Sequence, residues 1–487
     1  MIPFRSVGAR ERNFHCVTEC YQLVPVFWIL LKEELNHFVS GVKMAQSSVG
    51  VGIGYMHPLP AVPAGLNTLY QACRALYTDQ QNPLQVVAVR KYWMGGPDPL
   101  DYISMYSNVG DPSQGIPPHW HYVSFGLSDL HGDGRVHDFT GPGSPSGFGF
   151  ELTFRLRKEE GDTAPPTWPA AVMQGLARYV IQSDNILCNG DHVSWHCPLD
   201  NSESRIQHML MTVDAQLGTV ETPCGSVQFM QLVGVCQEEL KAAQHWNGKS
   251  FLQLMKGVPG LGGPWLVTNM RRGESVFELE VDVEEAVQMG ISQEGSDLSG
   301  VGAKMFWSEE MSGQIGHVSD CPGVTERNAD CASPVGERGI GRDVASGVGG
   351  LHKDPCEEQC LEEGMPPPIR RLKALHLHIN LEAGLLLPLM LKGRLKHGRH
   401  FTYKSAHDSN ALTFVVPSVQ GSFVTEEAPF GVEGQWCQAL IQEDLLEDMI
   451  DDLDHLTKDD PEMLTLPKTY NFPHHNLSIT LLPEDDY

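Results

Sequence analysis

The chain has 487 residues, of which 41% are hydrophobic, and this length favours at least two domains with cores of their own. Its formal net charge of −27 repels phosphate backbones, and no Lys/Arg cluster provides a compensating basic patch. The charge therefore argues against direct nucleic-acid binding, and it is compatible with partners that carry basic segments. The twelve cysteines are scattered along the chain, which favours reduced thiols in the cytosol or nucleus.

The first 57 residues have the character of a leader outside the folded core. Arginines precede the apolar run YQLVPVFWILL at 21–31, a pattern that resembles the charged and apolar regions of a signal peptide. The run is too short to span a bilayer, and no clear small-residue cleavage site follows it. We therefore predict a divergent, disordered leader over 1–57 and no membrane association. The segment from Met44, MAQSSVG, resembles a translation start.

From residue 58 the sequence takes on the patterns of a folded domain. Apolar residues at helical spacing predict a helix over 66–77. The β-branched run VVAVRKYW then predicts a strand over 86–93. HYVSFGLSDL and FGFELTFRLR alternate like two further strands, and the glycines of HGDGR suit a tight connection between them.

Helices and strands continue to alternate in the next part of the chain. Thr167 is predicted to cap a helix that has Pro169 in its first turn and an apolar stripe through Val172, Leu176 and Val180. A loop and strand then lead to VQFMQLVGV at 227–235. The amphipathic segment QEELKAAQHWNGKSFLQLMKGV follows, before the turn PGLGGPW.

The pattern fails between 308 and 368, where Gly, Ser, Asp and Glu dominate, so we predict a disordered insertion there. Strand-like segments resume with LKALHLHINLEAGLLLPLML, HFTYKS and ALTFVVPS. A helix with a solvated acidic face is predicted at 437–456. The alternation of helices with hairpin-like strand pairs indicates an α+β fold. We predict an N-terminal domain over 58–297 and a C-terminal domain over 298–487 that the insertion interrupts.

Histidine is common, with 21 residues, and three groups of side chains could be imagined to bind a metal ion. No H-E-x-x-H motif, and no H-x-E with a following P-C-x-x-C, accompanies any of them. Imidazoles bonded to carbonyls, or exposed on strands, are the favoured interpretation of each group. The groups are His119, His121, His131 and His137; Cys188, His192 and His196; and His376, His378, His397 and His400.

Three further signatures of zinc binding or catalysis are absent from the sequence. Cys321, Cys331, Cys356 and Cys360 lack the two-residue spacing of a zinc ribbon or finger. Neither a phosphate-binding G-x-x-x-x-G-K-[ST] loop nor a G-x-S-x-G nucleophile motif is present. A metal-dependent hydrolase that uses His119 and His121, or His192 and His196, is kept as the alternative function.

The stretch GDHVSWHCPLD at 190–200 combines acidic and imidazole side chains. In an extended chain, Asp191 and Val193 face one way while His192 and His196 face the other, so a single acid–base unit is hard to build. An acid beside an alternating apolar strand instead suits the capture of a peptide. Backbone pairing then supplies affinity, and the fixed charge supplies selectivity.

Several long motifs carry a more specific signal: KYWMGGPDPLDYISMY, PPHWHYVSFGLSDL, SGFGFELTFRL, GDHVSWHCPLDNSESRIQHML, GGPWLVTNMRRGE and GRLKHGRHFTYKS. Over roughly 58–307 and 369–483 the chain resembles the Suppressor of Fused family. The resemblance implies a non-enzymatic negative regulator of Hedgehog signalling, located in the cytoplasm and nucleus, that needs no cofactor. It implies Gli/Ci zinc-finger transcription factors as the partners, with kinesin-like and corepressor proteins of the same pathway as further ones.

The resemblance also implies where the partner binds. In this family two α+β domains, joined by a short linker, close around a peptide with the motif Ser-Tyr-Gly-His-Leu, which enters as an added β-strand. The matching sequence motifs imply that Asp191 lies opposite the peptide histidine, with Tyr179 and Leu187 along the same channel. The facing strand edges would come from the second domain, at Val301, Ala303 and Leu377.

The chain departs from the family pattern in its leader and in its insertion. The segment 308–368 lacks the basic-flanked serine cluster linked in the family to stabilising phosphorylation, and Lys373 stands in place of an acid near the groove. We expect these differences to alter regulation or affinity without removing the binding mode.

Overall fold

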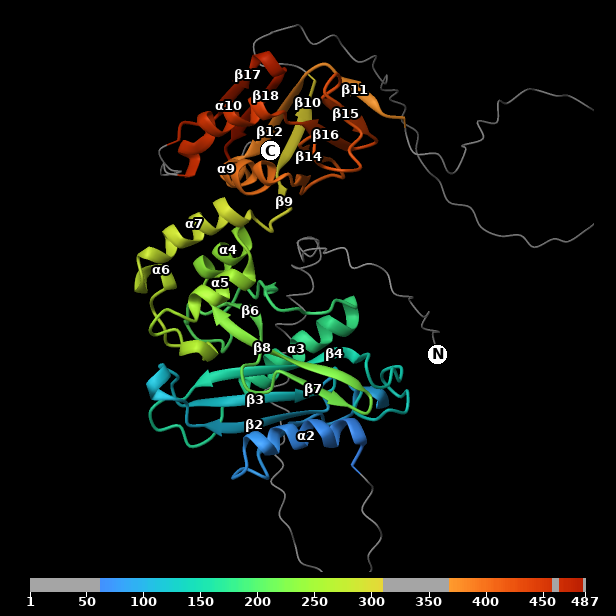
Figure 1. Ribbon diagram of the computed structural model, residues 1–487, viewed down its shortest axis with the longest axis vertical. Coiled ribbons are helices and arrows are strands. Elements are labelled where there is room, and N and C mark those ends of the chain that lie inside the picture. The colour runs from blue at the N-terminus through green and yellow to red at the C-terminus, as the bar shows by residue number, and fades with distance from the viewer. Residues whose placement is uncertain (1–61, 310–367, 458–463, 485–487) are drawn as a thin grey trace, which may run out of the picture.

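The computed structural model describes residues 62–309, 368–457 and 464–484, which form two lobes (Figure 1). The predicted leader and nearly all of the predicted insertion lie outside these ranges. The first lobe contains the chain up to helix α7, and the second lobe contains the chain from strand β9 onward. Within these ranges no helix combines the length and the hydropathy needed to cross a membrane. The prediction of an α+β fold with two mixed lobes is confirmed.

The first lobe is built on one mixed sheet. Its strand order is β1-β2-β3-β4-β8-β6-β5, and β7 pairs with β8 outside that order. The neighbours β4 and β8 run parallel, whereas β3 and β4 are antiparallel. The strands are β1 Leu84–Val87, β2 Tyr102–Asn108, β3 His119–Phe125, β4 Pro145–Arg157, β5 His192–Val193, β6 His208–Val213, β7 Thr219–Thr222 and β8 Gly225–Val235.

Helices cover both faces of this sheet. Leu66 of α2 packs with Val123 on one face, and Leu176 of α3 packs with Tyr122 on the other. Tyr122 and Val123 are neighbours on β3 and join opposite cores, because successive side chains of a strand alternate between faces. The helices are α2 Ala64–Leu76, α3 Trp168–Ser183, α4 Gln237–His245, α5 Gly248–Met255, α6 Val276–Leu279 and α7 Asp282–Glu294, with the 3-10 turns η2 Tyr92–Met94, η3 Pro112–Gln114 and η4 Gly263–Trp265.

Helices α4 to α7 lie between the large sheet and the second lobe (Figure 1). They share a core of their own, which includes Leu240, Phe251 and Val287. Leu389 of the second lobe packs against this core. This helical layer is therefore the structural connection between the two lobes.

The second lobe contains two sheets around a common core. The sheet orders are β10-β12-β18-β17 and β11-β15-β16-β14-β13-β9. Leu377 of the first sheet and Phe414 of the second are both fully buried in that core. The strands are β9 Gly300–Ala303, β10 Met305–Ser308, β11 Arg370–Leu372, β12 Leu375–Asn380, β13 Phe401–Ser405, β14 Ala411–Val415, β15 Phe430–Glu433, β16 Trp436–Leu440, β17 Lys468–Phe472 and β18 Leu477–Leu482.

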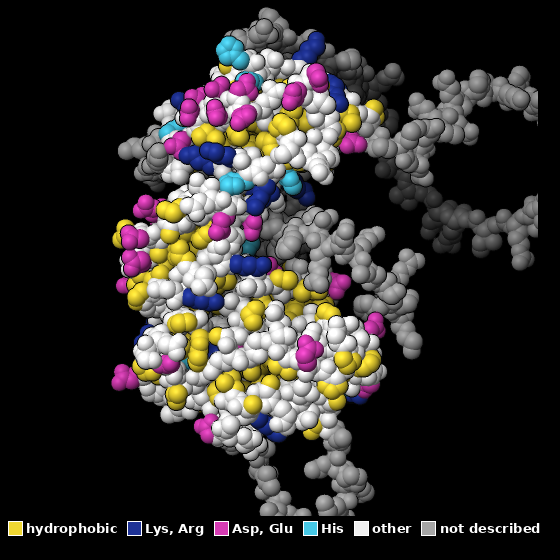
Figure 2. All heavy atoms as spheres, in the orientation of Figure 1, with side chains coloured by type: hydrophobic (Ala, Val, Ile, Leu, Met, Phe, Trp, Pro, Cys, Tyr) yellow, Lys and Arg dark blue, Asp and Glu magenta, His cyan; other side chains and the backbone are white. Residues whose placement is uncertain are grey.

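Short helical segments complete the second lobe. They are α8 Leu381–Gly384, α9 Leu387–Leu389, α10 Glu443–Leu453, the π-helical turn η5 Met390–Arg394, and the 3-10 turns η6 Leu395–His397, η7 Asp454–Thr457 and η9 Pro473–His475. Helix α10 buries Leu445, Met449 and Leu453, while Glu447 and Asp448 are exposed. The predicted solvated acidic face is confirmed, and it belongs to the acidic side chains visible on the second lobe in Figure 2.

Several predictions for the first lobe need correction. The strand predicted over 86–93 ends at Val87, because Gly96 N–H bonds back to the Lys91 carbonyl and folds that segment into a turn. The predicted tight connection between β3 and β4 is instead a long loop over 126–144. Thr167 lies at the start of α3, but its side chain makes no capping hydrogen bond there.

Two predictions for the second lobe also need correction. The strand-like text at 381–391 is helical, because Leu387 and Leu391, one helical turn apart, both enter the core. The helix predicted at 437–456 begins only at Glu443, because the preceding residues pair as β16 with β14 and β15. In both cases tertiary pairing decides between conformations that short apolar runs leave open.

Candidate functional site

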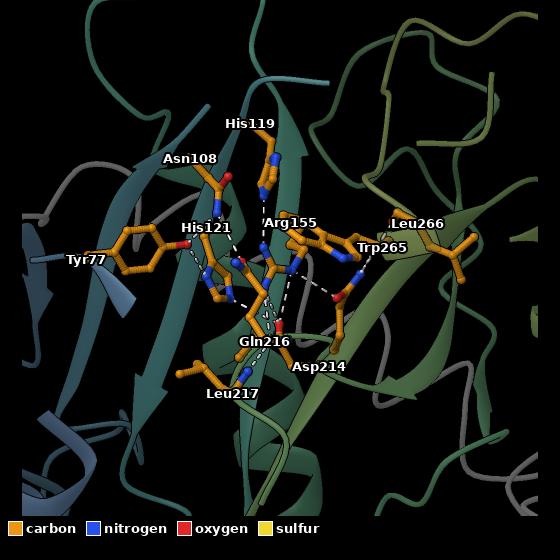
Figure 3. A network of polar contacts seen from close by, with 12 residues as sticks. Tyr77, Asn108, His119, His121, Arg155, Asp214, Gln216, Leu217, Trp265 and Leu266 are labelled. Carbon is orange, nitrogen blue, oxygen red and sulfur yellow. Dashed lines mark hydrogen bonds and ion pairs between the residues drawn. The ribbon is translucent and has the colours of Figure 1, made fainter. Parts of the chain in front are cut away.

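The two histidines of the HWH motif belong to a buried polar network in the first lobe (Figure 3). His119 and His121 alternate along β3 and so face the same side of the sheet, as predicted. Arg155 of β4 lies between them and Asp214: its Nη1 is 2.9 Å from His119 Nε2, and its Nη2 donates to Asp214 at 2.9 Å. His121 Nε2 is 3.1 Å from the same carboxylate, and Tyr77 Oη is 2.7 Å from His121 Nδ1.

Charge in this network is satisfied within the fold. Burial and the Arg155 charge lower the pKa of His121 to about 4 and that of His119 to about 3, so both imidazoles are neutral near pH 7. His121 and Arg155 hold the pKa of Asp214 well below its ordinary value, against the effect of burial. Arg155 and Asp214 therefore form a fully buried ion pair. The network joins β3, β4 and the turn after β6, which is a structural role.

A metal site at these histidines is not supported by the geometry. His119 Nε2 faces a guanidinium, and His121 uses both ring nitrogens within the network, so neither ring directs a free lone pair at a shared ion. In the second lobe, His376 Nε2 contacts Thr480 Oγ1 at 2.7 Å, and His378 stacks on Phe306. Over the described ranges, no group of three or more His, Cys, Asp or Glu side chains could hold a metal ion.

The second histidine pair, His192 and His196, does not follow the predicted alternation. Strand β5 ends at Val193, and His196 adopts φ 57°, which places it outside any strand. Its ring lies 5.3 Å from that of His208 on β6, and burial lowers the pKa of His208 to about 4. The extended run assumed from the sequence is therefore wrong beyond Val193, and an acid–base unit with Asp191 is not assembled.

A different feature stands out at the ends of the sheets. In the described part of the chain, β5 pairs only with β6 and closes the strand order of the first lobe. In the same way β9 pairs only with β13 and closes the six-stranded sheet of the second lobe. An edge strand carries a row of backbone N–H and C=O groups outside the ladder and is a template for pairing with another chain.

Asp191 lies immediately before the edge strand of the first lobe. Gly190 N–H donates to the Met211 carbonyl, and Met211 N–H donates to the Asp191 carbonyl, both at 2.8 Å. Because backbone groups alternate in direction along a strand, the next residue, His192, directs its N–H and C=O away from β6. The free edge of β5 thus begins directly beside the Asp191 side chain.

The Asp191 carboxylate is half-buried and lightly bonded. Its Oδ2 accepts a 2.7 Å hydrogen bond from Cys188 N–H. Burial raises the pKa of Asp191, although this bond and the nearby charge of Lys249 oppose the shift. A carboxylate that is partly desolvated, with hydrogen-bonding capacity to spare, favours an incoming cationic donor.

The other first-lobe residues predicted for the channel differ from each other. Tyr179 of α3 is half-buried, and its hydroxyl accepts a 2.8 Å hydrogen bond from Asn185, in the loop that leads to Asp191. Leu187 is only 3% exposed and belongs to the core of the lobe. The Leu187 side chain therefore packs inside the lobe, and its place along a peptide channel stays a prediction.

The second-lobe residues also separate into two kinds. Val301 and Ala303 lie on the edge strand β9, as predicted. Leu377 does not lie on an edge: β12 is paired on one side with β10 and on the other with β18, and the Leu377 side chain is fully buried. The prediction that Leu377 supplies a strand edge is therefore wrong.

Two glycines that sequence reasoning missed form the free side of β9. The Ser299 carbonyl accepts a hydrogen bond from Thr402 N–H of β13 at 2.9 Å, and the Ala303 carbonyl accepts one at 2.8 Å from Ala406 N–H, the residue after β13. By alternation, Gly300 and Gly302 direct their backbone groups to the opposite, free side. Gly302 is exposed, and a Cβ placed on it would meet nothing within 4 Å. The alternating glycines of SGVGA were the available sequence signal.

The fold and these edges define a class: a two-lobed α+β protein that presents one edge strand from each lobe, with a half-buried acid beside the first. Two family models match the chain: "Suppressor of fused protein (SUFU)" over residues 96–273 and "Suppressor of Fused Gli/Ci N terminal binding domain" over residues 285–481. The chain belongs to the Suppressor of Fused family.

Individual relatives agree with this assignment. The chain is 51% identical over 450 residues to the human Suppressor of fused homolog, which covers 86% of this chain and 92% of the human protein. The mouse homolog is 51% identical over 446 residues, with the same coverage. The crystal structure of Drosophila Suppressor of Fused aligns with a TM-score of 0.67 at 35% identity, covering 88% of this chain and 100% of that one.

Proposed function

We propose that this protein is a negative regulator of Hedgehog signalling that binds and sequesters Gli/Ci zinc-finger transcription factors. In this proposal a Ser-Tyr-Gly-His-Leu peptide of the factor enters as an added β-strand between β5 and β9. The observation that carries the proposal is the pair of edge strands, one from each lobe, with Asp191 at the start of one. The family model that matches the second lobe is described as a Gli/Ci-binding domain, which supports the choice of partner.

Each part of the site supplies a different component of recognition. Backbone groups of His192 on one side, and of Gly300 and Gly302 on the other, would pair with the peptide backbone and contribute affinity with little sequence selectivity. Asp191 would accept a hydrogen bond from the peptide histidine and favour its charged form. Such a charge-assisted bond contributes about 1.5–3 kcal/mol, so the carboxylate would be the main source of selectivity.

The proposed activity is binding without catalysis. We place the protein in the cytoplasm and nucleus, the compartments that the family resemblance implies, and its kinesin-like and corepressor partners rest on the same resemblance. No cofactor takes part in the proposed mechanism, because the groups that contact the peptide are backbone amides and one carboxylate.

The proposal is tested by titrating the protein with a synthetic peptide containing Ser-Tyr-Gly-His-Leu, using isothermal calorimetry. Asp191→Asn is expected to weaken binding by about ten- to a hundred-fold, the equivalent of one charge-assisted hydrogen bond. A peptide with alanine in place of its histidine should lose the same amount against the unchanged protein. Both changes together should cost little more than either alone, because they remove the same contact.

Asp184→Asn is the matched control. Asp184 is exposed at the end of α3 with φ 56°, a conformation that asparagine also tolerates, so the same acid-to-amide change leaves the backbone undisturbed. This variant should bind like the unchanged protein. Equal affinities of the Asp191 and Asp184 variants would remove Asp191 from the site, and no binding by the unchanged protein would overturn the proposed function itself.

A further inference from the structure

The two edge strands are connected to one side chain at the junction of the lobes. Glu294 is the last residue of α7, three helical turns from its start and six residues before β9. A negative charge at a helix C-terminus opposes the helix dipole, so stability of α7 does not account for an acid at this position. Its contacts show a different role.

On the first-lobe side, Glu294 Oε2 accepts three hydrogen bonds. The donors are Trp246 Nε1 at 3.0 Å, Asn247 Nδ2 at 3.2 Å and Ser250 Oγ at 3.2 Å. Asn247 is also the N-cap of α5, since its Oδ1 accepts from Ser250 N–H at 2.7 Å. One carboxylate oxygen thus holds the turn between α4 and α5.

That turn packs directly on the loop that carries Asp191. The backbone of Gly248, the first residue of α5, lies so close to the loop that a Cβ there would come within 1.9 Å of the Gly190 carbonyl oxygen. No side chain fits at Gly248 without moving the loop. A displacement of the start of α5 would therefore be passed to Gly190, Asp191 and the edge of β5.

On the second-lobe side, the chain around Glu294 is held by two arginines. Arg399 donates to the carbonyls of Glu294 at 3.3 Å and Ser296 at 3.0 Å, and the buried Arg394 donates to Ser296 at 2.8 Å. Ser296 N–H donates to the Gly393 carbonyl at 2.7 Å. The backbone of residues 294–296 is consequently attached to the second lobe.

Gly295 permits this sharp passage between the lobes. It adopts φ 83°, a conformation that favours glycine, and a Cβ there would lie 2.9 Å from the Gly393 carbonyl oxygen. Four residues further on, the Ser299 carbonyl accepts from Thr402 N–H, and β9 begins at the next residue. The free edge of β9 therefore follows the attachment point almost immediately.

We infer that Glu294 is a positioning residue for the peptide groove. Its side chain is bonded to the first lobe and its backbone to the second lobe, so Glu294 fixes the position of the β5 edge relative to the β9 edge. The inference rests on the proposed function. Glu294 does not touch the peptide in this scheme. Glu294 holds the two lobes in the binding arrangement before the peptide arrives, which lowers the free-energy cost of ordering them on binding.

The test is Glu294→Gln, measured by peptide calorimetry and by small-angle X-ray scattering of the protein without peptide. Glutamine keeps one acceptor oxygen of similar size but loses the charge that suits three donors. We expect peptide binding about five-fold weaker, the low end of usual coupling between sites, together with a larger radius of gyration of the free protein. Glu285→Gln, an exposed acid on the same helix, is the matched control and should change neither quantity.

A second variant approaches the junction from the other lobe. Arg399→Met removes the donors to the Glu294 and Ser296 carbonyls and should produce the same pair of changes. Asp191→Asn, by contrast, should lose affinity without any change in the scattering of the free protein. This pattern separates a residue that positions the groove from one that contacts the peptide.

Each result decides the inference. Affinity and scattering of Glu294→Gln and Arg399→Met that match those of Glu285→Gln would overturn it. If the unchanged protein does not bind the peptide, the proposed function fails. The scattering of the same variants still decides whether Glu294 fixes the arrangement of the lobes.

Discussion

Two carboxylates of the first lobe, Asp214 and Asp191, carry the same charge in opposite surroundings. Asp214 is fully buried and accepts hydrogen bonds from Arg155 and from the N–H groups of Gln216 and Leu217. Asp191 is half-buried, and its Oδ2 accepts a hydrogen bond from Cys188 N–H. The pKa of Asp214 is held well below the ordinary value by its partners, whereas burial raises that of Asp191.

The difference separates a charge that stabilises the fold from a charge kept for a ligand. Every strong partner of Asp214 comes from the protein itself, so its charged form is already favoured. The charged form of Asp191 is less favoured than in water, because the fold provides few groups that stabilise it. A cationic donor of a ligand would stabilise this carboxylate on binding. The contrast predicts loss of stability from changes at Asp214 and loss of affinity from changes at Asp191 and its strand edge.

The largest expected effect is on stability. Asp214→Asn leaves Arg155 as a buried charge without its counterion, and removing one partner of such a pair costs about 3–5 kcal/mol. The free energy of unfolding of the first lobe, followed by tryptophan fluorescence in urea, should fall by that amount. Asp133→Asn breaks the exposed pair of Asp133 with Arg135 and serves as the control, for which we expect an unchanged midpoint. Equal midpoints for the two variants would contradict the structural role of the network.

The next effect concerns the pH dependence of peptide binding. Pairing in the complex should raise the pKa of the peptide histidine above about 6.5, so its contribution is complete below that pH and is lost as pH rises through the bound pKa. Pairing should also lower the raised pKa of Asp191, so its contribution is complete above the free-protein pKa and is lost as pH falls. Affinity should therefore be highest in weak acid and fall about ten-fold between about pH 6 and 8, if the histidine shifts by one unit.

This titration is best confined to the upper side of that window. The pKa of His121 is lowered to about 4 and that of His119 to about 3, and both would take up protons on unfolding. The unfolded chain then binds more protons below about pH 6.5, so the fold loses stability as pH falls from there toward 4. Calorimetry from about pH 6 to 8.5 avoids this effect. A profile as steep for Asp191→Asn as for the unchanged protein would show that another group is responsible.

Sequence reasoning succeeded where information is local and failed where it is not. Alternation along the HWHYVSF strand correctly placed His119 and His121 on one face. The same pattern could not show that Arg155 and Asp214, from other strands and turns, occupy the space between them. An imidazole pair with spacing that suits a metal therefore looks the same in sequence as one that completes a buried ion pair.

Strand order was the other missing information. Leu377 lies in a short apolar run that predicts a strand, and Val301 lies between two glycines, yet β12 is central and β9 is an edge. Hydrophobic alternation reports which face of a strand is buried and says nothing of how many neighbours the strand has. The resemblance to a known family identified Asp191 and β9 by matching text. The backbone direction of Gly300 and Gly302 became apparent only from the hydrogen bonds of β13.

The smallest expected effect isolates that backbone edge. Gly302→Pro removes the N–H that points to the free side of β9, while the bonds of the Ser299 and Ala303 carbonyls to Thr402 and Ala406 remain. Proline also favours an extended conformation in the preceding residue, Val301, which β9 already requires. One net backbone hydrogen bond contributes about 0.5–1.5 kcal/mol, so peptide affinity should fall about two- to ten-fold while lobe stability changes little.

Gly302→Ala is the control for this change, because the space beside Gly302 is open and alanine keeps the N–H. If the proline and alanine variants bind the peptide equally, β9 does not pair with the peptide. Asp191 would then recognise the peptide without a contribution from the second lobe's strand edge. If the proline variant alone is weakened, and by the same factor for peptides with and without histidine, backbone pairing and charge recognition act independently. The contrast between Asp214 and Asp191 requires this independence. The strand edge contributes affinity for any extended peptide, and the Asp191 carboxylate selects among such peptides.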